Sequence, residues 1–407
     1  MFPAASGFRP VPGLVPAKGD DDIRRCICFL LCLLLSQAVF PAHALDNNPY
    51  LDEAIRKVFK NHQTIGGELI VAKNGQFVYE YDYGYSYVRQ KEPVNERTHF
   101  RIASVTKLLS AIRVMQLVEA GKLDLDRDLS EYYGYDIRNT YVPDSRLTLR
   151  NLMTHTASLK VSGGFTNTKS TLRSLLSTDK KQTANYYNEA FGSVYRYSNF
   201  GAGIMGSLIE LVTGENVNDD VSAHVFAPLG IDAAYHPSLL ADTDSVAYLY
   251  KRNGTLQYSR RVLLSRDWDP SVNPELHYRT TVGSIWITAR DLCRIGMLFL
   301  QGGELDGVRL LKEETVQEMM SSQKGKGNVV IDSPYGLCVN RVDNLIDGYL
   351  IYGHQGLSDD ICANLYFEPK SQLVFAFVTN GCNNNLKDAI CSISRSLFTE
   401  IWAIYGD

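Results

Sequence analysis

The sequence predicts an α/β fold: one antiparallel sheet, built from both ends of the chain and flanked by helices, with a mainly helical inserted lobe. Three observations support this prediction. A hairpin pattern lies near the start of the globular region, short helical patterns fill its middle, and a strand meander followed by a helix lies at its end. We expect the two distant groups of strands to meet in one sheet.

The first part of the globular region has the pattern of a helix, a hairpin and a long helix. Apolar residues recur at helical spacing in 49–60. Two strand patterns, 67–72 and 76–83, flank Lys73-Asn74-Gly75, which is a typical hairpin turn. A long helix is predicted to begin near Ser104 and to end at Gly121, since glycine often ends a helix.

The remaining elements follow from the same periodicities. Residues 122–282 are interpreted as the helical lobe, and strands return after it. The predicted elements are helices at 149–154, 202–212, 217–226 and 287–301, strands at 335–340, 349–354, 361–367 and 373–379, and a last helix at 386–405.

Composition indicates a globular protein and excludes some classes of partner. Of the 407 residues, 45% are hydrophobic and 21% are charged, with a formal net charge of -4. There is no long basic run, so no nucleic-acid partner is expected. Without an internal repeat or a low-complexity linker, residues 45–407 are predicted to be a single domain.

Residues 1–44 have the pattern of a secretory signal. Arg24-Arg25 precedes an apolar run, and Ala42-His43-Ala44 is a small-x-small ending, so cleavage is expected after Ala44. The apolar run is short for a membrane span, although an uncleaved anchor is the alternative. The mature protein is therefore expected to be secreted or periplasmic, with no stable membrane span.

The cysteines indicate neither a cofactor nor a metal site. Five cysteines remain after the signal region, and this odd number permits at most two internal disulfides. No Cys-x-x-Cys or paired Cys/His spacing occurs, so a structural zinc site is not expected. The mature cysteines are Cys293, Cys338, Cys362, Cys382 and Cys391.

A Ser-x-x-Lys motif is the first indication of chemistry. At the start of a helix it places a nucleophile and a base on one face, beside amides that favour developing negative charge. The motif occurs at Ser104-Lys107, Ser177-Lys180 and Ser321-Lys324. Since Ser104 alone opens a long apolar helix, it is the predicted nucleophile, and the other two are interpreted as ordinary surface residues.

A tyrosine motif and a histidine motif follow in the chain. Tyr197-Ser198-Asn199 precedes an apolar helix, whereas the similar Tyr186-Tyr187-Asn188 has no such anchor. A tyrosine near a lysine can accept and return a proton. Gly353-His354-Gln355-Gly356 ends a strand, where a glycine lets a substrate backbone approach. By itself, His354 is more often structural than catalytic.

Ser-x-x-Lys, Tyr-x-Asn and His-x-Gly in this order resemble the serine β-lactamase and penicillin-binding superfamily, nearest to class C β-lactamases and related DD-peptidases. The resemblance implies Ser104 as the acylated nucleophile and Lys107 with Tyr197 as the proton-transfer pair. It implies Asn199 as a hydrogen-bond partner of substrate and lysine, and His354 and Gly356 as pocket residues. The oxyanion donors would be the backbone amides of Ser104 and Leu357.

The resemblance implies an exported serine hydrolase that acts on peptide or amide substrates through an acyl-enzyme. A small molecule or a cell-wall peptide is the expected partner. A carboxylesterase and a non-catalytic penicillin-binding-like module are the alternatives. Departures concern the pocket: Gln355 replaces the usual hydroxyl residue, Leu357 is bulkier than usual, and Gly283-Ser284 begins a stretch with fewer glycines. Arg341 is a candidate carboxylate clamp, with a surface arginine as the alternative.

Overall fold

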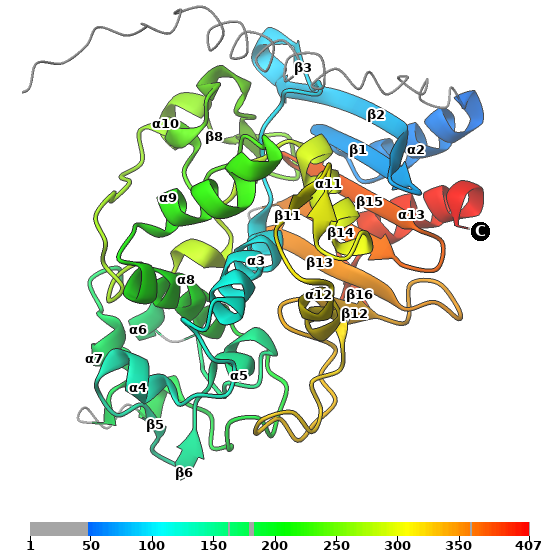
Figure 1. The fold of residues 1–407 in the computed structure, drawn as a ribbon. Coiled ribbons are helices and arrows are strands. Elements are labelled where there is room, and N and C mark those ends of the chain that lie inside the picture. The colour runs from blue at the N-terminus through cyan, green and yellow to red at the C-terminus, as the bar shows by residue number, and fades with distance from the viewer. Residues whose placement is uncertain (1–47, 162, 179–182, 359, 407) are drawn as a thin grey trace, which may run out of the picture. The chain divides into compact units, whose positions relative to one another are not determined.

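We analysed a computed structural model, which describes residues 48–161, 163–178, 183–358 and 360–406 (Figure 1). The expected signal region, 1–44, lies outside these residues. Leu45–Asp407 forms one compact unit. No helix among the described residues is both long and apolar enough to cross a membrane.

The central feature is a seven-stranded antiparallel sheet that joins the two ends of this unit. Its order is β12-β13-β14-β15-β1-β2-β3, and the pairing of β1 with β15 joins the N-terminal hairpin to the C-terminal meander. The predicted fold class is therefore confirmed. The strands are β1 (Gly66–Lys73), β2 (Gln76–Tyr87), β3 (Glu92–Pro93), β12 (Asn340–Val342), β13 (Ile351–Ser358), β14 (Ile361–Glu368) and β15 (Leu373–Thr379).

Helices cover both faces of this sheet. On one face, α2 (Pro49–Asn61) and α13 (Ser392–Tyr405) pack over a core that includes Leu69 and Phe377. On the other, α11 (Ala289–Leu300) packs on β1, β14 and β15, over a core that includes Ile70 and Ala376. The alternation follows from strand geometry, since successive side chains point to opposite faces. Both layers are visible in Figure 1.

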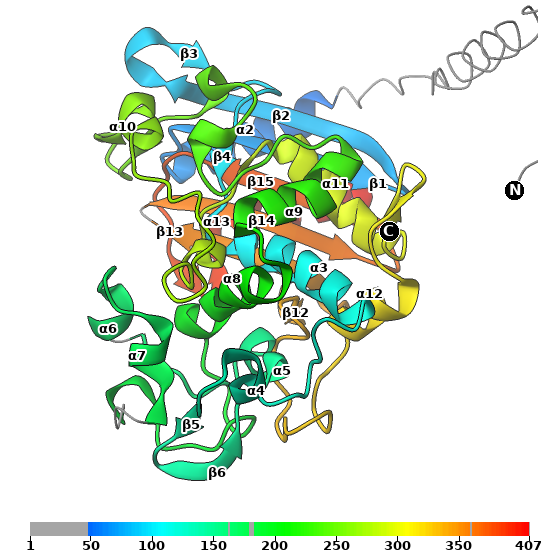
Figure 2. The ribbon, with the colours of Figure 1, turned by 60° about the vertical axis from the view of Figure 1, so that its left-hand side comes forward.

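The helical lobe lies beside the sheet, and α3 (Thr106–Glu119) packs against α8 (Asn199–Thr213) in its centre (Figure 2). Its other helices are α4 (Leu129–Tyr133), α5 (Leu149–Met153), α6 (Gly163–Thr166), α7 (Leu172–Leu176), α9 (Val217–Val221) and α10 (Arg260–Leu264). Short pairs are β5 (Arg138–Asn139) with β6 (Val142–Arg146), β7 (Leu249–Tyr250) with β8 (Leu256–Tyr258), and β4 (Phe100–Arg101) with β9 (Trp286–Ile287).

Two predicted elements differ clearly from the structure. Most of the strand expected at 335–340 is absent, because Cys338 has φ 57° and breaks the extended run, so β12 begins only at Asn340. The last helix begins at Ser392, because β16 (Leu386–Lys387) and β17 (Ile390–Cys391) form a hairpin before it. The remaining elements are β10 (Glu304–Leu305), β11 (Val308–Arg309) and α12 (Glu313–Met320).

Candidate active site

Ser104 lies in a single helical turn, Ala103–Val105, that leads directly into α3. Lys107 is in the first turn of α3, so the two side chains share a face, and the Lys107 Nζ donates a hydrogen bond of 2.8 Å to the Ser104 Oγ. Lys107 also donates to the backbone carbonyl of Val282 at 2.6 Å. The Val282 carbonyl thus holds the amine beside the serine hydroxyl.

Burial changes the acid-base behaviour of Lys107. The side chain is completely buried, and burial lowers the pKa of its amine to about 7, against a weaker raising effect from Cys338. Desolvation disfavours the charged form of an amine, which explains the direction. Lys107 is therefore half deprotonated near neutral pH and can accept the Ser104 proton.

Tyr197 reaches the same pair from the loop before α8. Ser198 caps this helix by accepting a hydrogen bond from the Gly201 amide, which fixes the loop. The Lys107 Nζ lies 5.3 Å from the centroid of the Tyr197 ring. Tyr197 is 41% exposed overall, but its hydroxyl end is buried. Burial raises the pKa of this hydroxyl, and the hydrogen bond with Ser104 lowers the pKa by a smaller amount. Tyr197 is thus a neutral phenol at physiological pH.

Asn199 is the first residue of α8 and lines the pocket beside Ser104. Its Oδ1 is buried and accepts no hydrogen bond. The Lys107 amine instead donates to Ser104 and Val282. The Asn199 carbonyl is therefore an unused acceptor at the pocket, which a substrate N–H could satisfy.

His354 does not have the environment expected of a pocket cation. It is 1% exposed, its Nδ1 lies 2.6 Å from the Gln355 carbonyl, and it is not among the residues that line the pocket. Burial and the neighbouring Lys107 lower its pKa to about 3, while the Gln355 carbonyl raises it less. The implied place of His354 among the pocket-lining residues is therefore wrong, because this imidazole is buried and neutral.

Gly356 brings strand β13 directly against the nucleophile. A Cβ atom at this position would lie 2.1 Å from the Ile102 carbonyl oxygen and 3.1 Å from the Ser104 amide nitrogen, so a side chain cannot fit. Leu357, the next residue, is 41% exposed and lines the pocket. The expected oxyanion residues, Ser104 and Leu357, thus lie on two segments that this glycine allows to meet.

Gln355 points to a different neighbour. Its side-chain amide donates to the Ala389 carbonyl, and its Oε1 accepts a hydrogen bond of 3.1 Å from the Cys391 amide. Since both ends of the amide are occupied, Gln355 fastens the β16–β17 hairpin to β13. Gln355 therefore stands at the position of the usual hydroxyl residue without taking over that residue's contact with the substrate.

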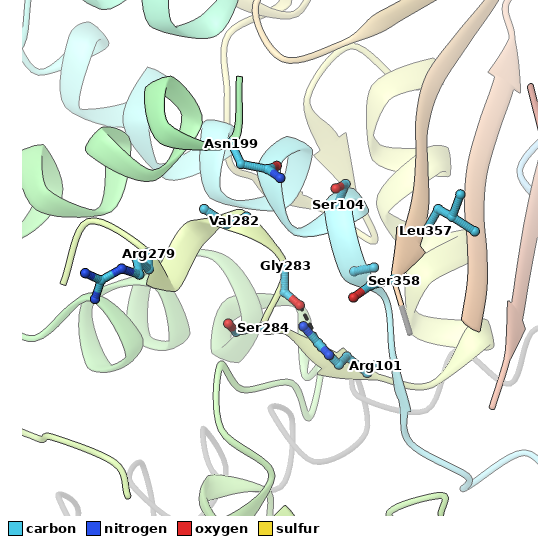
Figure 3. A pocket seen from close by; sticks show the side chains of 10 residues that line it. Arg101, Ser104, Asn199, Arg279, Val282, Gly283, Ser284, Leu357 and Ser358 are labelled. Atoms are coloured by element: carbon cyan, nitrogen blue, oxygen red, sulfur yellow. Dashed lines mark hydrogen bonds between the residues drawn. The ribbon is translucent and has the colours of Figure 1, made fainter. Parts of the chain in front are cut away.

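The pocket has a volume of about 160 Å³, and the described residues that line it include two arginines and no carboxylate residue (Figure 3). Arg101 donates a hydrogen bond of 2.9 Å to the Gly283 carbonyl, which fixes one wall. The sequence-based prediction missed both arginines. Arg101 stands three residues before the nucleophile and could have been noticed, whereas Arg279 gave no local signal. The lining residues are Arg101, Ala103, Ser104, Asn199, Arg279, Val282, Gly283, Ser284, Leu357 and Ser358.

Further aromatic rings surround the pair of Lys107 and Tyr197. The His155 ring lies 4.3 Å from that of Tyr197, and its Nδ1 accepts a hydrogen bond from the Ser198 amide. Tyr335 packs against His155 at 4.9 Å and against His354 at 5.5 Å. Tyr197, which belongs to this group of rings, lies over the buried Lys107 amine, and burial lowers the pKa of that amine.

The alternative motifs lie elsewhere. Ser177 is 1% exposed in a bridge to Ile137, so its interpretation as a surface residue is wrong, but it does not line the pocket. Ser321 ends α12 and bonds to Glu318 and Lys326. Tyr186 is buried and donates to the Leu176 carbonyl. Arg341 forms an ion pair with Asp332 and does not line the pocket.

A serine hydrogen-bonded to a buried lysine, at the start of a helix and against a sheet strand, defines a site for acyl transfer through serine. Residues 51–395 match the family model described as "Beta-lactamase". The chain belongs to this family of serine hydrolases.

Individual relatives differ in their described activities. The chain is 26% identical over 308 residues to "Penicillin-binding protein 4" of Amycolatopsis lactamdurans, covering 74% of this chain and 75% of that protein. It is 30% identical over 264 residues to "Monacolin J acid methylbutanoyltransferase" of Aspergillus terreus, covering 56% and 62%. The octameric penicillin-binding protein homologue from Pyrococcus abyssi superposes with a TM-score of 0.68 at 20% identity, covering 89% of this chain and 78% of that one.

Proposed function

We propose that the protein hydrolyses a peptide or amide bond through an acyl-enzyme on Ser104. The supporting observation is the 2.8 Å hydrogen bond between Ser104 and a lysine whose pKa is about 7. The Ser104 Oγ attacks the substrate carbonyl carbon and its proton passes to neutral Lys107. The C–N bond then breaks, and the proton reaches the departing amine by way of Tyr197.

In the second half of the reaction, water attacks the ester carbonyl of the acyl-enzyme. A water proton passes to the Lys107 and Tyr197 pair, the C–Oγ bond breaks, and Ser104 recovers its hydrogen as the acid product leaves. The backbone amides of Ser104 and Leu357 stabilise the oxyanion in both halves. Asn199 positions the substrate through its unused carbonyl oxygen.

The charge of the pocket supports a substrate that contains a carboxylate. Arg101 and Arg279 are among the described residues that line it, and none of those described lining residues is acidic, so their charge favours an anion. A peptide ending in a D-amino acid, such as a cell-wall stem peptide, meets this requirement. Such a substrate agrees with the proposed removal of 1–44 and with a secreted or periplasmic location. The alternative is a carboxylesterase, which is supported by 27% identity over 218 residues to "Esterase EstB" of Burkholderia gladioli, covering 48% of this chain and 53% of that protein.

Intact-protein mass spectrometry tests this function. The protein is exposed to a labelled penicillin, to a peptide ending in D-alanyl-D-alanine, and to a short-chain nitrophenyl ester. We expect a penicillin adduct and release of the terminal D-alanine, and slower release when that carboxylate is amidated. Ester turnover without a penicillin adduct or peptide cleavage would instead establish the carboxylesterase.

The pH dependence follows from Lys107. Because its pKa is lowered to about 7, kcat/KM is expected to rise as pH increases through about 7 and then to level off. His354, with a pKa of about 3, stays neutral across this range. We therefore expect the same acid limb for a carboxylate substrate and a neutral ester, measured from about pH 5 to about pH 9. An additional alkaline limb for the carboxylate substrate alone would restore a cationic role for His354.

A further inference from the structure

Three carboxylates gather on one face of the β1–β2 hairpin, outside the catalytic pocket. Glu68 lies directly opposite Asp82 in the register, and Glu80 is opposite Ile70, two residues further along β1. Residues two apart in a strand share a face. One carboxylate oxygen of each residue lies within 4.8 Å of the others. Like charges in such positions repel one another unless something neutralises them.

Glu68 is the unusual member of this cluster. Its exposed fraction is 0%, and neither carboxylate oxygen accepts a hydrogen bond. A buried polar group without a partner is costly, so two unsatisfied carboxylate oxygens aimed into an acidic cluster indicate a missing partner.

Arg290 supplies part of the neutralising charge. It stands in the first turn of α11 and donates to the Glu80 Oε2 at 2.8 Å, while its guanidinium lies 4.0 Å from the centroid of the Phe77 ring. The group thus contains three carboxyl side chains and one bonded arginine, which contacts Glu80.

We propose that Glu68, Glu80 and Asp82 bind a hard divalent cation of the Ca²⁺ type. All donors are oxygens, which Ca²⁺ prefers over softer metals. The three oxygens lie within 4.8 Å of one another, and two oxygens on opposite sides of one Ca²⁺, each about 2.4 Å from it, are separated by about the same distance. Asp82 is exposed, so water can complete the coordination on that side. Mg²⁺ fits less well because it requires a near-ideal octahedron.

Such an ion would strengthen the N-terminal half of the sheet. Glu68 is on the strand that pairs with both β2 and β15, and α11, which packs on that strand, provides Arg290. The three ligands all lie on β1 and β2, so the ion would join these two strands beneath α11. Because it contacts no residue of the catalytic pocket, its effect is on the stability of the folded protein, independently of the proposed chemistry.

Calorimetric titration of the full chain, freed of metal by a chelator, with CaCl₂ tests the site. We expect binding with a Kd on the order of 10⁻⁴ to 10⁻³ M, weaker binding of MgCl₂, and a Tm that rises with Ca²⁺. Glu68→Gln and Asp82→Asn should each weaken Ca²⁺ binding by at least about tenfold. The control Glu314→Gln removes an exposed carboxylate on α12 and should bind like the parent.

Glu68→Gln has a second expected effect that separates binding from damage to the fold. Without Ca²⁺ it should unfold at the parent temperature or above it, because the substitution removes a buried, unpaired carboxylate. If that variant fails to fold, Asp82→Asn at an exposed position provides the same binding test. Absence of Ca²⁺ binding at about 10 mM, or equal affinity in the parent and these variants, would overturn the proposal.

Discussion

Replacing Ser104 with alanine is expected to abolish covalent labelling and to reduce turnover by at least about four orders of magnitude. The reason is that the substitution removes the atom that would bond to the substrate, while the oxyanion amides and the pocket remain. Labelling is measured by intact-protein mass spectrometry, and turnover by hydrolysis of the ester and the peptide. The substitution removes only a hydroxyl group, so the fold should persist. Circular dichroism can verify this.

Ser177→Ala and Ser321→Ala are the matched controls, because each serine begins another Ser-x-x-Lys motif. Neither lines the pocket, so both variants should be labelled and should turn over substrate like the parent. Labelling that persists in Ser104→Ala would contradict the assignment of the nucleophile. Loss of labelling in a control with an intact fold would do so as well.

Lys107→Met and Tyr197→Phe are each expected to lower kcat by roughly two to four orders of magnitude. Methionine keeps much of the length of the buried lysine but cannot accept a proton, and phenylalanine keeps the ring but lacks the hydroxyl. Since both residues contact Ser104, they act on one proton path. The double variant should therefore lose little more than the more damaged single variant.

Tyr195→Phe is the control for this pair. Its ring packs against Tyr335 at 6.0 Å, near the site, but the side chain does not line the pocket. We expect less than about a tenfold change in kcat, well below the usual value of general acid-base catalysis.

If the losses in the double variant of Lys107 and Tyr197 multiply, these two residues serve separate steps. The rise of kcat/KM with pH near pH 7 should also disappear in Lys107→Met. A purely structural role of Lys107 would not explain that loss.

The sequence by itself predicted the features that depend on neighbouring residues. The turn at Asn74 and Gly75 has the positive φ values, 52° and 73°, that this dipeptide favours. The helix predicted at 287–301 is present as α11, and Thr288 caps its start. Helical spacing alone places Ser104 and Lys107 on one face. Each follows from local backbone geometry, which sequence patterns report directly.

Boundaries that depend on pairing were less predictable. The hairpin of β16 and β17 replaced the start of the last helix because Gln355, a distant residue, bonds to Ala389 and Cys391. Helical periodicity in the sequence cannot reveal such a partner. Likewise, β13 continues to Ser358, past the predicted end at residue 354, because β14 pairs with its whole length.

Tertiary structure alone decided the chemistry of the side chains. His354 has a sequence context typical of a pocket residue, but rings from other segments bury it and keep it neutral. The same burial lowers the pKa of Lys107. Arg279 reaches the pocket from the end of the helical lobe, and Glu68 loses its solvent beneath α11. The charge state of a side chain depends on desolvation and on the neighbours that folding brings to it. The sequence therefore determined which ionisable groups are present, and the packing determined how they ionise.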